Sequence, residues 1–197
     1  MVLPRIWLSC AADGNGQQEG ALTLQLISDL RNAGADITAP PNADLNPNTN
    51  ENAPGLVQNI SGNFTLETQV EKPANAPTNE FWAMGLALTW GNSDSYFRLE
   101  MNTTTFDFEQ SINGVFNHDA PAALANANIS ASQAQLRLVR SGNTLSAYYS
   151  LPGQSWQLIN TVNAPLQSQD LQVGLDVVNI TNAPFTGYYH YFRVTCN

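Results

Sequence analysis

Hydrophobic and polar residues alternate with a period of two along most of the chain after residue 58. In segments 64–70, 96–101 and 171–177, one side of the extended chain is apolar and the other is polar. Residues 82–90 form a nearly continuous apolar run, which is typical of a central strand of a sandwich. This pattern predicts an all-β fold, a two-sheet antiparallel jelly-roll sandwich.

The clearest local signal is a β-hairpin at residues 136–150. Alternating residues 136–140 lead into the turn sequence Ser141-Gly142-Asn143, and a second strand pattern runs from residue 144 to 150. Strand patterns of this kind recur about every 8–15 residues, as in an all-β sandwich.

The first 57 residues show a different pattern. Residues 5–9 predict a short buried strand, and helical spacing of apolar residues predicts an amphipathic helix near 19–33. Residues 35–38 predict the start of a second strand, and the Pro- and Asn-rich segment 39–57 predicts a linker. We therefore expect a strand-helix element at 1–38, a linker at 39–57 and the sandwich at 58–197.

Composition and charge exclude several classes of partner. Sixteen acidic residues against seven Lys and Arg give a formal net charge of −9. Such a chain repels nucleic acid and anionic membranes, and it has no basic cluster to overcome that repulsion. It shows neither a signal-peptide pattern nor an apolar run long enough to span a bilayer, so a cytoplasmic location is the default expectation.

The two cysteines, Cys10 and Cys196, lie near opposite ends of the chain. Two cysteines are too few to indicate a disulfide framework, so we expect two unpaired thiols. The alternative is a disulfide that closes nearly the whole chain, which the chain-entropy model values at about 4–5 kcal/mol.

The hairpin region resembles the concanavalin A-like, or laminin G-like, jelly rolls of bacteria, especially the family named regulation of enolase. The matching positions are Arg140, Ser141, Gly142, Asn143, Tyr149, Ser150, Gly153 and Trp156. Pro152 stands where that family usually has Asp. The resemblance covers about residues 60–195. It implies the fold but not one function, because related sandwiches include carbohydrate binders, adhesion modules and enzyme accessories.

The first segment resembles the opening strand and helix of a TIR domain. The resemblance rests on residues 5–9, on Leu22, Leu26 and Leu30, and on the run 33–36. The rest of a TIR domain is missing, including the helix that carries the NAD-cleaving glutamate of that family. The alternative is a plain amphipathic helix and strand packed on the sandwich.

Candidate catalytic groups are sparse. Asp107 and Glu109 lie on one side of a predicted strand, about 7 Å apart by strand rise, which is within the range of a glycosidase carboxylate pair. His118 and His190 are isolated in the sequence, and no Gly-x-Ser-x-Gly motif is present. We therefore expect no catalytic residues, and an enzyme that uses Asp107 and Glu109 is the first alternative.

Loop oxygens offer a weak calcium site. Asn92, Asp94, Asn117 and Asp119 provide the hard oxygen ligands that calcium prefers. The same residue types also form turns in polar loops, so we expect no cofactor, with calcium as the alternative.

Alternation places a set of polar and aromatic residues on the outer side of the predicted sheets. If Phe97, Leu99 and Met101 face the core, the outward residues form the expected ligand-binding set: Tyr96, Arg98, Glu100, Asp107, Glu109, Arg137, Tyr148 and Asp176. We expect a non-catalytic module that recognises a carbohydrate or a protein through this face. A second alternative is an intracellular signalling or defence protein whose TIR-like segment recruits partners.

Overall fold

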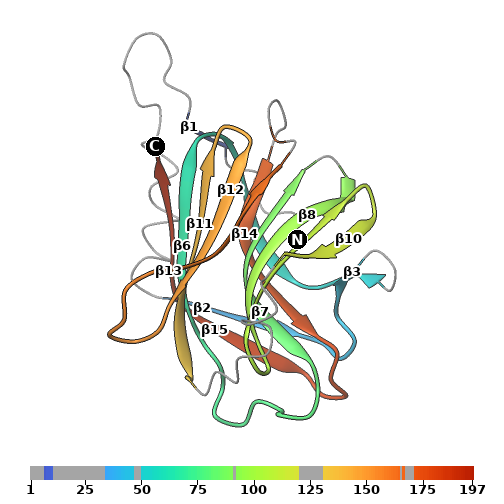
Figure 1. Cartoon of the computed structure of the whole chain (residues 1–197). Coiled ribbons are helices and arrows are strands. Elements are labelled where there is room, and N and C mark those ends of the chain that lie inside the picture. The colour runs from blue at the N-terminus through green and yellow to red at the C-terminus, as the bar shows by residue number, and fades with distance from the viewer. Residues whose placement is uncertain are drawn as a thin grey trace.

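A computed structural model describes residues 7–10, 34–46, 50–90, 92–119, 131–164, 166 and 171–197. Within these residues the regular secondary structure consists of strands, arranged as two large sheets that pack face to face (Figure 1). The predicted all-β sandwich is confirmed.

Each sheet mixes strands from distant parts of the chain. Sheet A contains, in spatial order, β1 (Trp7–Cys10), β5 (Gly55–Gly62), β14 (Leu171–Asn179), β7 (Trp82–Trp90), β8 (Asn92–Asn102), β9 (Phe106–Ile112) and β10 (Val115–His118). Sheet B contains β13 (Gln157–Asn163), β12 (Thr144–Ser150), β11 (Gln133–Ser141), β6 (Phe64–Glu71), β15 (Phe185–Cys196) and β2 (Ala35–Ala39). A small hairpin consists of β3 (Leu45–Asn46) and β4 (Asn50–Glu51). The β1–β5 pair is parallel, and the other pairs of the two large sheets are antiparallel.

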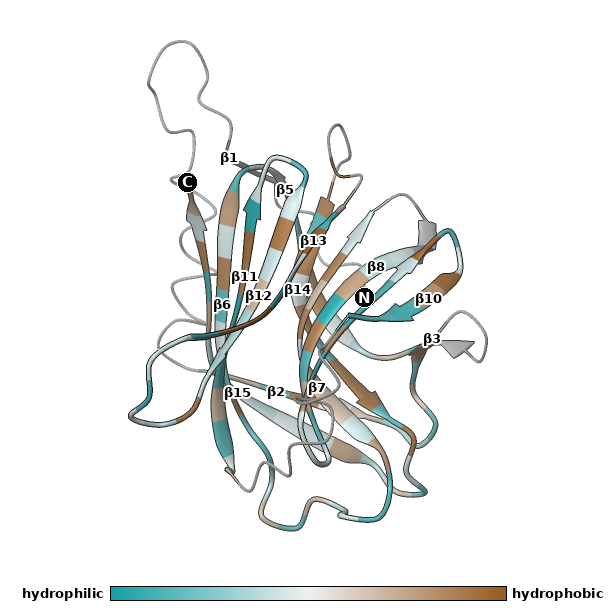
Figure 2. Cartoon of the chain, viewed as in Figure 1, coloured by the Kyte–Doolittle hydropathy of each residue, from teal (hydrophilic) through white to brown (hydrophobic). Residues whose placement is uncertain are grey.

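The core lies between the two sheets and is built by alternation. Phe64 and Leu66 of β6 and Phe97 and Leu99 of β8 are fully buried. Figure 2 shows the alternation as apolar and polar segments that follow one another along β11 and β12. Burying one such side chain stabilises the fold by about 1.5–3 kcal/mol relative to leaving it exposed. The predicted inward direction of the alternating residues in β8 is therefore correct.

The predicted hairpin at 136–150 is present as β11 and β12. Ser141 pairs with Thr144, and Gly142 adopts a positive φ of 59°, which glycine accepts without strain. Arg140 Nε donates a hydrogen bond of 3.1 Å to the Gly142 carbonyl oxygen, so the arginine before the turn also stabilises it.

The strands do not follow the expected division at residues 38 and 57. β1 joins the edge of sheet A and β2 joins the edge of sheet B, so both belong to the sandwich. The segment 39–57 includes β3, β4 and the start of β5, and Ala43 bridges to Asn179. It is part of the fold rather than a free linker. The predicted helix near 19–33 lies outside the described residues.

The cysteine prediction is wrong. Cys196 is disulfide-bonded, and Cys10 is the only other cysteine of the chain. Cys10 stands opposite Gly62 in sheet A, and Cys196 stands opposite Phe64 in sheet B. Both positions adjoin the short connection between β5 and β6, where the chain crosses from one sheet to the other, so the register places Cys10 and Cys196 at the same corner of the sandwich.

No helix among the described residues has the length and apolar character needed to cross a bilayer.

Candidate functional site on the outer face of sheet A

The outer face of sheet A carries a band of charged side chains. Alternate residues of β8 pack into the core, which leaves Tyr96, Arg98 and Glu100 on the other side of the sheet. In the strand register, Arg98 stands opposite Glu109 of β9, and Glu100 stands opposite Gly85 of β7.

The register arranges this band in two rows that cross the sheet. The first row is Asp176, Gly85, Glu100 and Asp107, and the second is Gly174, Ala87, Arg98, Glu109 and His118. The residues of β7 in both rows have little or no side chain, so the longer charged groups on either side can extend over β7. We call this set of residues the polar band.

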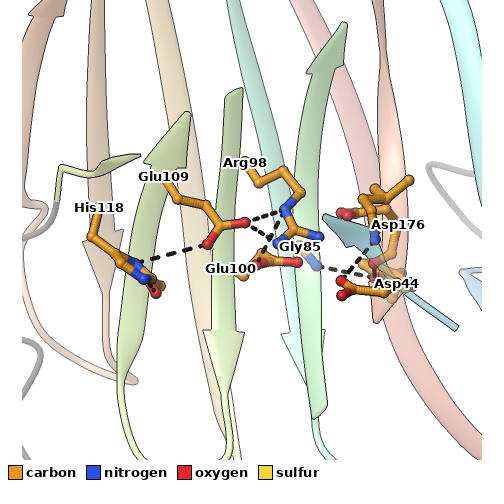
Figure 3. A network of polar contacts seen from close by, with 10 residues as sticks. Asp44, Gly85, Arg98, Glu100, Glu109, His118 and Asp176 are labelled. Atoms are coloured by element: carbon orange, nitrogen blue, oxygen red, sulfur yellow. Dashed lines mark hydrogen bonds and ion pairs between the residues drawn. The ribbon is translucent and has the colours of Figure 1, made fainter. Parts of the chain in front are cut away.

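A buried ion pair occupies the centre of the polar band (Figure 3). Arg98 donates two hydrogen bonds to Glu109 Oε1, and its Nε lies 3.7 Å from Glu100 Oε2. Burial lowers the pKa of Arg98, but the nearby carboxyl groups of Glu100 and Asp176 outweigh burial and raise that pKa. The guanidinium therefore stays charged and holds the carboxyl groups around it.

Glu100 and Asp176 form a second buried pair on either side of Gly85. Burial raises the pKa of Glu100 from 4.5 to about 8, although Arg98 opposes this shift. Burial also raises the pKa of Asp176, again against the opposing effect of Arg98. Two buried carboxyl groups so close to one cation favour retention of one proton by the pair at neutral pH.

Gly85 must be a glycine for this arrangement. A Cβ at this position would lie 2.0 Å from the backbone oxygen of Leu99 and 2.8 Å from Cα of Glu100. Any other residue would therefore displace β8, which carries the central arginine of the polar band.

A tyrosine from sheet B holds the backbone beneath the first row. Tyr189 of β15 is buried, and its hydroxyl group crosses the core to sheet A. This hydroxyl accepts a hydrogen bond of 3.1 Å from Gly85 N and donates one to the carbonyl oxygen of Asp176. It links β7 and β14 at the point where Asp176 and Gly85 are register partners.

Several buried polar atoms of the polar band have no hydrogen-bond partner among the described residues. They are Arg98 Nη1, Tyr96 Oη, Glu100 Oε1 and both carboxylate oxygens of Asp176. Burial raises the pKa of Tyr96 to about 12, partly offset by the positive charge of Arg98. Native proteins pair nearly all buried polar atoms, so these groups have capacity for further hydrogen bonds.

The polar band opens to solvent at the edge formed by β9 and β10. The exposed fraction of the side chain rises from 1% at Glu100 and 5% at Glu109 to 16% at Asp107 and 60% at His118. His118 Nδ1 lies 3.1 Å from Asp107 Oδ2 and 3.9 Å from Glu109 Oε2. The ring of Phe116 packs edge-on against the imidazole at 4.7 Å between centroids.

The structure brings together six of the eight predicted ligand-binding residues. Tyr96, Arg98, Glu100, Asp107, Glu109 and Asp176 all lie in the polar band or beside it. The expectation that they are exposed is wrong for all of them but Asp107, which is partly exposed, because the other five are buried.

Arg137 and Tyr148 lie elsewhere, on the outer face of sheet B, where they are register partners. Arg137 donates a 2.6 Å hydrogen bond to Glu67 and packs over the Trp156 ring at 3.9 Å. These two residues belong to a different surface from the polar band.

The calcium site remains a prediction, although the backbone around its candidate residues differs from the expected loops. Asn92 and Asp94 belong to β8 rather than to a loop, Asn117 is exposed at the end of β10, and Asp119 accepts a 3.1 Å hydrogen bond from Gln110. Among the described residues, the group whose atoms could hold a metal ion is instead Asp107, Glu109 and His118.

His118 was missed as a site residue, although a signal for it exists. Asn113-Gly114 is a typical two-residue hairpin turn, and both residues have positive φ. A turn at this place pairs Ile112 with Val115, and counting outward pairs Glu109 with His118.

Tyr189 was also missed, as was Asp44, whose carboxyl group lies near enough to Arg98 to raise its pKa (Figure 3). The contacts of both residues depend on packing between distant segments.

Residues 28–196 match a protein family described as DUF1349, protein of unknown function. The chain belongs to the DUF1349 family. No curated protein matches its sequence. The finer resemblances, to regulation of enolase and to a TIR domain, remain predictions.

Solved structures share the fold of this DUF1349 chain at low sequence identity. A mutant of the GH43 protein BlXynB from Bacillus licheniformis has 11% identity and a TM-score of 0.65, over 83% of this chain and 33% of that chain. A functionally unknown protein from Saccharomyces cerevisiae has 12% identity and a TM-score of 0.61, over 83% and 88% of the two chains. Alginate lyase A1-II′, of polysaccharide lyase family 7, has 10% identity and a TM-score of 0.53, over 82% and 79%. The DUF1349 chain thus spans about a third of the length of the GH43 protein.

Proposed function

We propose that this DUF1349 chain binds a neutral saccharide at the polar band of sheet A and does not cleave it. The observation that carries the proposal is the set of buried donors and acceptors that have no hydrogen-bond partner among the described residues and lie beside an open edge. Sugar hydroxyl groups both donate and accept hydrogen bonds, so they are suited to such a mixed set. The shared fold with a GH43 protein and a polysaccharide lyase supports a carbohydrate as the ligand.

The charge of the polar band favours a neutral ligand over an acidic one. Its cationic side chain, Arg98, is already engaged by carboxyl groups, and Asp44, Glu100, Asp107, Glu109 and Asp176 surround it. The whole chain also carries a net charge of −9. A uronate polymer such as alginate would be repelled both at long range and at the site.

The open edge at β9 and β10 gives the ligand its access. At this edge His118 is exposed and Asp107 is partly exposed, and Phe116 offers a partly buried aromatic ring beside them. Arg98 donates hydrogen bonds to Glu109 from the buried side of the polar band, so the position of the Glu109 carboxyl group is fixed before a ligand binds.

Isothermal titration calorimetry with xylohexaose and an alginate hexasaccharide, in 1 mM EDTA, tests the proposal after a glycan array has screened for hits. We expect a neutral glycan to bind with a Kd of about 10–1000 µM and alginate to give no heat. Asp107→Asn should weaken binding at least about fivefold, or about 1 kcal/mol. Glu71→Gln is the matched control, because Glu71 forms a similar carboxylate–histidine pair with His190 on sheet B. Absence of any glycan binding tighter than millimolar would overturn the proposal.

A second candidate function is polysaccharide cleavage, and one observation favours it. The raised pKa values of Glu100 and Asp176 are the property that a general acid needs near neutral pH. The sequence offers Asp107 and Glu109 as the catalytic pair of the alternative enzyme, whereas these two residues are engaged by His118 and Arg98. Release of reducing ends or unsaturated uronates from xylan or alginate, abolished by Glu100→Gln, would replace the binding proposal with this one.

A further inference from the structure

We propose that Asp107, Glu109 and His118 bind a divalent transition-metal ion at the open edge of the polar band. One ligand atom from each of these residues lies within 4.8 Å of the other two. The closest of these atoms are His118 Nδ1 and Asp107 Oδ2, 3.1 Å apart. Ligands about 2.0–2.2 Å from one ion are separated by roughly 3–3.6 Å, so small side-chain rotations bring all three into range.

The strand register holds the three residues in place. Glu109 and His118 are direct partners across β9 and β10, and Asp107 lies two residues before Glu109 on the same face of β9. The T-shaped contact with Phe116 restricts the orientation of the imidazole ring. A site on two paired strands needs less ordering on binding than a site assembled from loops.

Arg98 orients the glutamate for this role. It donates both of its hydrogen bonds to Oε1 of Glu109, while Oε2 is the oxygen that faces His118, at 3.9 Å from Nδ1. Carboxylates that bind a metal are typically oriented by a hydrogen-bond donor on the oxygen that faces away from the ion. The ion pair and the metal site therefore use different oxygens of the same side chain.

An independent observation beside the three ligands points to a bound species. Glu100 stands opposite Asp107 in the register, is almost fully buried, and its Oε1 has no hydrogen-bond partner among the described residues. Three protein ligands leave at least one coordination position for water. A metal-bound water donates hydrogen bonds, and the register places the Glu100 carboxyl group, an acceptor, on the strand next to the one that carries Asp107.

The ligand types favour a transition metal over calcium. One imidazole nitrogen and two carboxylate oxygens suit Zn²⁺, Mn²⁺ or Fe²⁺, whereas Ca²⁺ takes six to eight oxygen ligands. The two carboxylates balance the charge of a divalent ion. Among the described residues this is the group of three that could hold such an ion, which makes it distinct from the other histidine–carboxylate pair of the chain, His190 with Glu71.

The test is calorimetric titration of the metal-free protein with ZnCl₂, without any saccharide. We expect one Zn²⁺ per chain with a micromolar Kd. His118→Ala and Asp107→Asn should each weaken binding at least tenfold. His190→Ala, which removes an exposed histidine next to a single carboxylate, should leave the Kd within twofold. Circular dichroism checks that each variant is folded, and His118 is exposed enough for its removal to leave the fold intact.

Cobalt provides a second readout that does not depend on affinity. Co²⁺ added to the wild-type protein should give visible d–d absorption bands that are lost in His118→Ala and kept in His190→Ala. The proposal is overturned if Zn²⁺ does not bind below 1 mM, if the two histidine variants lose affinity equally, or if the Co²⁺ spectrum is unchanged in His118→Ala. Because no glycan is present, these results are independent of the saccharide proposal.

Discussion

Replacing Tyr189 with phenylalanine removes a hydroxyl group that links sheet B to the backbone under the polar band. The ring of Tyr189 stays buried in the variant, so the packing of the core is retained. What is lost is the hydrogen bond from Gly85 N and the hydrogen bond to the Asp176 carbonyl oxygen. Both backbone groups lie in the interior, where an unsatisfied donor or acceptor costs about 1–3 kcal/mol.

The expected loss is about 2–4 kcal/mol of the free energy of unfolding. The lower end applies if β7 and β14 move together and bond directly, since Gly85 and Asp176 are already register partners. For a chain of this size, such a loss lowers the melting temperature by roughly 5–15 °C. The neighbouring substitution Tyr188→Phe is the control, because Tyr188 is 37% exposed and its loss should cost less than about 0.5 kcal/mol.

Urea unfolding followed by tryptophan fluorescence measures both variants. The slope of the free energy against urea should match the wild-type slope, which shows that the same surface is exposed on unfolding. If Tyr189→Phe and Tyr188→Phe differ by less than 0.5 kcal/mol, the hydroxyl group does not support the two strands and this reasoning is wrong.

Three further predictions concern stability. The pKa of Glu100 is about 8 in the folded state instead of 4.5, so the free energy of unfolding should fall as pH rises from about 4.5 to 8. The fall should be less steep in Glu100→Gln. Urea unfolding at pH 5, 7 and 9 measures both slopes. Reduction of the disulfide at Cys196 should remove up to about 5 kcal/mol, visible as a lower melting temperature in dithiothreitol, whereas an unchanged value would show that the bond is not structural. Gly85→Ala should cost more than about 3 kcal/mol because its Cβ would meet the Leu99 oxygen at 2.0 Å; a soluble variant of wild-type stability would contradict this contact.

Alternation predicted the direction of side chains well but said little about what covers them. Residues 96–101 alternate cleanly, and Arg98 and Glu100 do lie on the outer side of sheet A. A period of two predicts on which face of a strand each side chain lies. Whether that face is buried depends on its contacts in the folded chain. The same limit applies to Arg137 and Tyr148. They lie on the outer face of a sheet, as predicted, but that sheet is sheet B.

The edge strands were harder to predict than the central ones. β1 and β2 are short, and each pairs with a strand from a distant part of the chain. Their place in the sandwich depends on non-local pairing, which local propensity does not encode. Tyr189 illustrates the same point, since its alternation indicates burial but not that its hydroxyl group reaches the backbone of the opposite sheet.

The most direct test of the central claim is to locate a bound neutral glycan by amide chemical shifts of the ¹⁵N-labelled protein during titration. We predict that the largest shift changes occur in β8, β9 and β10, around Arg98, Glu109 and His118. Changes that centre instead on β11, β12 and β13, around Arg137 and Tyr148, would show that the ligand binds sheet B and would contradict the assignment of the polar band as the binding face.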